Sequence, residues 1–233
     1  MLINNTHDKS HPALKTSEIL ESISQDRTRT NLLRKHEQRA LAFLVQRIPS
    51  WISSNMLTAI GFCGSVIVFA SFVLAAYINR NYLILGVLGF TISWFGDSLD
   101  GRVAYFRNKP RKLYGFTLDI TIDWISILLI GCGYIVYAQD IWELLGYGFI
   151  VMYGWEIIIA LMRYKITGKY SIDSGIFGPT EVRIVISAIM LAEVLFPGSL
   201  IYSAILMVVI LLSSNIADTR KLLKIADSMD KKG

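Results

Sequence analysis

The sequence has few cysteines and lacks the apolar core of a signal peptide. Only two cysteines, Cys63 and Cys132, occur in 233 residues, and both lie within apolar runs. This scarcity argues against a disulfide framework or a cysteine metal site, and it favours small packing residues at both positions. Residues 1–22 are polar and mixed in charge, so we expect no cleaved secretion signal there.

The sequence also lacks the alternation of apolar and polar residues that marks half-buried strands, and it has no internal repeat or low-complexity segment. Instead, the sequence contains long apolar segments. Hydrophobic residues make up 53% of the chain, and the mean hydropathy is +0.48. Because the apolar runs are too long for strands, the predicted fold class is an all-α integral membrane protein.

Six apolar segments are predicted to cross the membrane: 56–78, 82–99, 118–138, 142–162, 182–196 and 200–216. Around them we divide the chain into four parts. These are a flexible cytosolic tail (1–28), an amphipathic interfacial helix (29–49), a six-helix transmembrane domain (50–217) and a cytosolic C-terminal tail (218–233).

The positive charges of the chain fall between its hydrophobic segments. The net charge is +5, which in a soluble protein would suggest nucleic acid. Here lysines and arginines gather before residue 56, in 107–112, in 163–169 and in 220–224, whereas the alternate connections hold only Arg80. This bias predicts that both termini and the 97–123 region face the cytosol, and it predicts no nucleic-acid partner.

Residues 29–49 carry apolar side chains at roughly helical spacing with arginines and lysines among them, and Pro49 ends the pattern. We expect an amphipathic helix lying on anionic lipid headgroups. The alternative is a basic stretch beside the membrane with no defined orientation.

Four carboxylates occur within the apolar sequence. Asp97 and Asp100 are three residues apart, and Asp119 and Asp123 are four apart, so each pair shares a helix face. A carboxylate at membrane depth costs at least about 2.5 kcal/mol, and four together would repel one another. Hard divalent cations such as Mg²⁺ or Mn²⁺ are the natural counter-charge. Two such cations could serve a substitution at a pyrophosphate, with one carboxylate as general base, although spacing does not distinguish base from ligand.

This run resembles the signature of the CDP-alcohol phosphotransferase family, Asp-x-x-Asp-Gly-x-x-Ala-Arg followed by Gly-x-x-x-Asp-x-x-x-Asp. Tyr105 stands where the family has arginine, and Arg102 or Arg107 could supply that charge from nearby. Residues 49–58 resemble the family's opening segment through Asn55 and Thr58. The matching signature positions are Asp97, Asp100, Gly101, Ala104, Gly115, Asp119 and Asp123.

The resemblance implies a role for each acid. Asp97, Asp100 and Asp119 would hold two divalent cations, Mg²⁺ or Mn²⁺, and Asp123 would be the catalytic base and a further ligand. The remaining candidates are substrate-binding residues. They are Asn55, Gly101, Arg102, Ala104, Arg107, Gly115, Glu181 and Arg183.

Two groups among these candidates have a simpler alternative. The small residues Gly101, Ala104 and Gly115 would let a nucleotide approach closely, or they would only allow helices to pack. Glu181 and Arg183 lie in a Gly-Pro-Thr-Glu block, where they would select a headgroup or simply belong to a capped membrane helix.

The implied activity is transfer of a phosphatidyl group from CDP-diacylglycerol to a small polar alcohol, with release of CMP. The alternative enzyme uses CDP-choline or CDP-ethanolamine and a lipid alcohol acceptor. The resemblance further implies membrane lipids as partners, a homodimer and a bacterial inner membrane. Two other classes remain as alternatives: a cation transporter, whose acids would be spread through the bilayer depth, and a catalytically weak structural member of the family, for which Tyr105 is the reason.

Overall fold

The computed structural model describes residues 34–168 and 179–231, and all regular structure in these two ranges is helical. The predicted flexible tail, residues 1–28, lies outside the described residues. The short turns Arg80–Tyr82 and Asp140–Trp142 lead into α4 and α6. The helices are α2 (Arg34–Val45), α3 (Ser54–Tyr77), α4 (Leu83–Phe106), α5 (Lys112–Ala138), α6 (Glu143–Thr167), α7 (Pro179–Leu195) and α8 (Ser199–Asp230).

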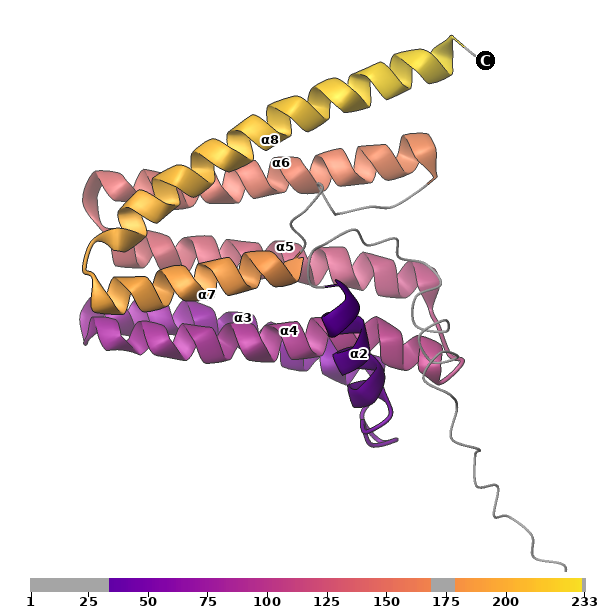
Figure 1. Cartoon of the computed structure of the whole chain (residues 1–233), viewed down its shortest axis with the longest axis horizontal. Helices are drawn as coiled ribbons and strands as arrows, with labels where there is room; N and C mark the ends of the chain where they lie inside the picture. The colour runs from indigo at the N-terminus through magenta and orange to yellow at the C-terminus, as the bar shows by residue number, and fades with distance from the viewer. Residues whose placement is uncertain (1–33, 169–178, 232–233) are drawn as a thin grey trace, which may run out of the picture.

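Five of these helices, α3, α4, α5, α6 and α8, are long and apolar enough to cross a membrane. The prediction of a helical integral membrane protein is therefore confirmed. The sixth predicted span corresponds to α7, which has 17 residues. At about 1.5 Å per residue it measures about 26 Å, less than the roughly 30 Å of a hydrocarbon core. α7 accordingly runs beside only part of the bundle (Figure 1).

The pair α3–α4 is packed through glycines. A Cβ atom added at Gly64 would overlap the backbone of Ser93, and one added at Gly96 would overlap the backbone of Gly61. Small residues at such contacts let two membrane helices approach backbone to backbone. This contact fixes the position of the α4 segment that carries Asp97 and Asp100 against α3.

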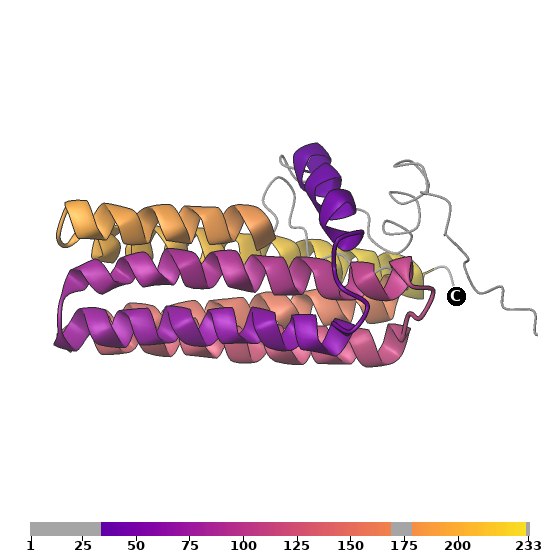
Figure 2. The same cartoon turned by 90° about the horizontal axis from the view of Figure 1, so that it is seen from below.

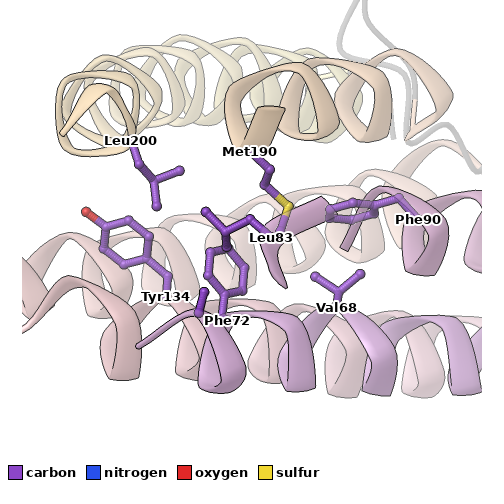
Figure 3. Close-up of a cluster of buried hydrophobic side chains, with 8 residues drawn as sticks. Val68, Phe72, Leu83, Phe90, Tyr134, Met190 and Leu200 are labelled. Carbon is purple, nitrogen blue, oxygen red and sulfur yellow. The ribbon is translucent and has the colours of Figure 1, made fainter. Parts of the chain in front are cut away.

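A hydrophobic cluster joins α3, α4, α5, α7 and α8 (Figure 3). Met190 of α7 is fully buried and points towards Leu83 of α4, so the short α7 is tied to the long helices by apolar packing. The labelled members of the cluster are Val68, Phe72, Leu83, Phe90, Tyr134, Met190 and Leu200.

A buried acid holds the turn between α7 and α8. Glu193 accepts hydrogen bonds from the Tyr137 hydroxyl at 2.8 Å and from the backbone N–H groups of Gly198 and Leu200 at 2.9 and 2.7 Å. The first N–H groups of a helix have no partner within the helix, so this carboxylate supplies one to the start of α8.

The segment predicted as an interfacial helix contains α2, which is shorter than residues 29–49; residues 29–33 lie outside the described range. α2 stands at a steep angle to the bundle (Figure 2). Leu41 and Val45 pack against Leu57 and Leu99, whereas Phe43 is exposed. The apolar face of α2 thus rests partly on the ends of α3 and α4, and its contact with lipid headgroups stays a prediction.

The turn that follows α2 is held by an arginine of α4's C-terminus. Arg107 donates hydrogen bonds to the carbonyl groups of Ile48, Pro49 and Ile52 at 3.1, 2.9 and 2.6 Å. Its guanidinium therefore connects the end of α4 to the segment between α2 and α3.

α8 continues to Asp230, well past the predicted end of the last apolar segment at residue 216. No glycine or proline interrupts this stretch, and Leu222 is buried within it. Much of the predicted C-terminal tail is consequently an extension of α8.

Candidate active site

Three carboxylates from two helices meet at one point. Asp97 lies in the second half of α4, and Asp119 and Asp123 lie one turn apart on α5. One oxygen atom from each carboxylate lies within 4.8 Å of the other two. Because the connection between α4 and α5 is a short basic loop, Asp97 on α4 and the two aspartates on α5 lie at the same level of the bundle.

The fourth acid, Asp100, lines the same cavity but turns towards α3. Its Oδ2 accepts a 2.7 Å hydrogen bond from the Thr58 hydroxyl, and its Oδ1 accepts from the backbone N–H of Gly101. Ser54 also donates to the Asp100 carbonyl at 2.9 Å. Asp100 is therefore buried and oriented by α3, next to the group of three acids.

A basic residue from α7 completes the centre. Nη1 of Arg183 lies 2.8 Å from Oδ2 of Asp97, and both side chains are partly exposed to the cavity. Arg183 was predicted to bind substrate, and the structure places its guanidinium against one of the acids. Its guanidinium offsets part of the negative charge of the three carboxylates.

The cavity draws on four helices, α3, α4, α5 and α7. Two of its serines were not anticipated, although their spacing gives a signal: Ser93 lies four residues before Asp97, and Ser126 lies three after Asp123. The lining residues are Thr58, Gly61, Phe62, Ser93, Asp97, Asp100, Asp119, Ile122, Asp123, Ser126 and Arg183.

The donor set suits a hard divalent cation. All four acids offer only oxygen atoms, which Mg²⁺ and Mn²⁺ prefer, and three of them are already close enough to share a cation. The residues present therefore fit the metal ions that the sequence implies.

Three predicted substrate-binding residues, Asn55, Arg102 and Arg107, do not line this cavity. Arg102 is buried and donates to the Ser98 carbonyl, and Arg107 is engaged with the α2–α3 segment. Asn55 accepts from Arg111 at 2.5 Å and donates to the Tyr114 hydroxyl at 3.3 Å.

The remaining candidates lie on α4, α5 and α7. A Cβ atom at Gly115 would meet no heavy atom within 4 Å, so this glycine is not required for helix packing. Gly101 and Ala104 are partly buried on α4, as is Tyr105. Glu181 is buried in the first turn of α7.

One polar residue on a neighbouring helix was not anticipated at all. Tyr153 lies on α6, which packs against α5, the helix that carries Asp119 and Asp123. Its ring also packs against Phe149, with 5.6 Å between the ring centroids. No motif contains this tyrosine, and its place in the fold follows only from the packing of α6 against α5.

Comparison of the sequence with known protein families gives a family match. Residues 51–214 match the sequence profile of the CDP-alcohol phosphatidyltransferase family. No curated protein matched the chain in a sequence comparison. The family match covers well over half of the chain, including all four acids, and the family acts with divalent metal ions. The chain belongs to the CDP-alcohol phosphatidyltransferase family, whose members transfer a phosphatidyl group from a CDP-linked donor to an alcohol acceptor.

Proposed function

We propose that this protein transfers the phosphatidyl group of CDP-diacylglycerol to a small polar alcohol and releases CMP. The observation that carries this proposal is the meeting of Asp97, Asp119 and Asp123 within 4.8 Å, in the register of the family signature. An anionic pyrophosphate can approach such a group only together with cations, which is how a carboxylate cluster becomes a phosphate site.

In the proposed reaction the alcohol oxygen forms a bond to the phosphorus of the phosphatidyl group, and the bond from that phosphorus to the CMP oxygen breaks. The alcohol proton passes to the carboxylate of Asp123, the general base. Asp97, Asp100, Asp119 and Asp123 would hold two cations, Mg²⁺ or Mn²⁺, which stabilise the attacking and leaving oxygens when bound. Arg183 is positioned to exchange its contact with Asp97 for a phosphate oxygen of the donor.

The proposal also gives roles to Gly115, Arg102 and Arg107. Gly115 has open space beside it, which supports the close approach of a nucleotide. Arg102 and Arg107 each donate to backbone carbonyls, which supports a role in shaping the donor side rather than in direct phosphate binding. The cytosolic orientation, the bacterial inner membrane and a homodimer are part of the proposal and rest on charge placement and family resemblance.

The test uses purified protein with CDP-diacylglycerol and a panel of alcohols, with lipid products identified by mass spectrometry. We expect a phospholipid product and CMP in equal amounts, loss of activity with a chelator and recovery with Mg²⁺ or Mn²⁺. Asp123→Asn should reduce the rate by about 10² to 10⁴. Product from CDP-choline and diacylglycerol alone would assign the other donor, and the absence of product from every donor would support a structural member of the family.

A further inference from the structure

Arg111, the residue just before α5, links the beginnings of α3 and α5. Its Nη2 donates to Oδ1 of Asn55, in the first turn of α3, at 2.5 Å. Its guanidinium also lies over the ring of Tyr114, 4.1 Å from the ring centroid, and Nδ2 of Asn55 donates to the Tyr114 hydroxyl at 3.3 Å. We call these three exposed residues, Asn55, Arg111 and Tyr114, the Arg111 group.

Two helix faces connect the Arg111 group to the carboxylate cavity. Asn55 and Thr58 are three residues apart on one face of α3, about 4.5 Å along the axis, and Thr58 lines the cavity. Gly115 and Asp119 are four apart on one face of α5, about 6 Å along the axis, and Asp119 lines the cavity as well. The backbone N–H of Gly115 donates to the Arg111 carbonyl at 2.7 Å. The Arg111 group therefore lies about one turn outward from the cavity on both helices.

The space between this group and the acids is open on the side of α5. A Cβ atom added at Gly115 would meet no heavy atom within 4 Å, and Gly115 is itself exposed. A ligand that has phosphates at the carboxylates can therefore extend past Gly115 to Arg111.

The arginines near the site differ in how easily an anion replaces their present partners. Arg102 and Arg107 were the predicted substitutes for the signature arginine, whose place Tyr105 takes. Arg102 is buried on a backbone carbonyl, and Arg107 donates to three backbone carbonyls. Arg111 instead donates to a neutral side-chain amide at an exposed position. Because a charge-assisted hydrogen bond is roughly twice as strong as a neutral one, a phosphate can replace this amide at little cost.

The ring of Tyr114 holds the Arg111 guanidinium in an orientation that suits an anion. A guanidinium carries five N–H donors, all in its plane. Stacking on Tyr114 uses the face of the guanidinium and fixes this plane, and Asn55 accepts from one edge. The donors along the rest of the edge match the oxygens of a phosphate, which binds through parallel hydrogen bonds.

We propose that Arg111 binds a phosphate of the CDP-linked donor at the mouth of the carboxylate cavity, with Tyr114 as its positioning residue. The inference rests on the proposed function and deepens it. The CMP half of the donor lies towards Gly115 and Arg111, while the phosphorus that is attacked lies at the acids. Arg111 thus supplies a phosphate contact from the start of α5, independent of position 105.

The test measures the Kd for CMP in the presence of Mg²⁺, by calorimetric titration of the full-length protein in detergent, and the KM for CDP-diacylglycerol in the transfer assay. Arg111→Gln keeps an amide donor for Asn55 and removes the charge. It should raise both values by roughly 10-fold, the effect of one lost charge-assisted contact, and leave the acceptor KM unchanged. Arg111→Lys keeps the charge without the planar fork, so its values should lie between those of the wild type and Arg111→Gln.

The matched control is Lys109→Gln, which removes an exposed positive charge from the same connection. It should leave the Kd for CMP and the donor KM unchanged. If Arg111→Gln does not fold, Arg111→Lys carries the comparison. CMP binding by Arg111→Gln as tight as by Lys109→Gln would overturn this inference while transfer itself stood. Wild-type protein that forms no product from any donor would instead overturn the proposed function, and the CMP titrations would still decide the role of Arg111.

Discussion

Replacing Asp119 by asparagine should stabilise the protein in the absence of divalent cations. The oxygens of Asp97, Asp119 and Asp123 lie within 4.8 Å of one another. With an effective dielectric constant of about 20, two unit charges at this distance repel by about 3.5 kcal/mol. Asp119→Asn removes two such repulsions and weakens the other interactions of this carboxylate, so we expect a net gain of about 3 kcal/mol.

The same substitution should remove the effect of added metal. A cation at 100 times its dissociation constant stabilises the protein that binds it by about 2.7 kcal/mol. For a chain of this size, each kcal/mol shifts the melting temperature by about 2–4 °C. The wild-type protein should therefore melt about 5–11 °C higher with Mg²⁺ than with a chelator, whereas Asp119→Asn should change little.

The measurement is thermal unfolding of the detergent-solubilised protein, followed by tryptophan fluorescence at pH 8 with chelator and with Mg²⁺. Asp227→Asn is the control, because it removes an exposed carboxylate of α8 far along the chain from the site. The reasoning is refuted if Asp119→Asn melts at or below the wild type in chelator, or if Mg²⁺ shifts both proteins equally.

Three further predictions follow from the topology and from the loop side of the site. A cysteine at Lys109 should be labelled from the cytosolic side and one at Asp140 from the opposite side, because of the lysine and arginine bias; labelling of both from one side would contradict the orientation. Tyr105→Arg should lower the KM for CDP-diacylglycerol by about 10-fold or more, since a charge-assisted phosphate contact is worth roughly 1.5–3 kcal/mol. An unchanged KM would make the tyrosine a tolerated packing change. Arg107→Ala should lower the free energy of unfolding by about 2 kcal/mol, because it breaks three hydrogen bonds to carbonyls. Lys109→Ala is the control and should change the free energy of unfolding by less than about 0.5 kcal/mol in the same denaturation assay. Equal effects of the two variants would refute the role of Arg107.

Local spacing predicts the part of the site that lies within single helices. Asp119 and Asp123 share a face because they are four residues apart, and the short basic loop brings them to the level of Asp97. Hydrophobic length likewise predicts the membrane helices, since each long apolar run must satisfy its own backbone in lipid.

Contacts between distant segments were beyond what spacing could predict. Arg183 reaches Asp97 across 86 positions, and Asp100 is drawn to Thr58 by the close packing of α3 against α4. Both depend on how helices dock, which hydrophobic periodicity does not specify.

The glycine contacts between α3 and α4 have a consequence for redesign of this enzyme. Around Gly64 and Gly96 any side chain would force the two backbones apart, so the helix that carries Asp97 tolerates little change. α8 is far less buried, with 11% of its apolar window inside the bundle against 44% for the helix that includes α4. A library confined to α8 should therefore yield mainly folded protein with an intact carboxylate cluster, whereas one in α3 and α4 should yield mainly unfolded protein.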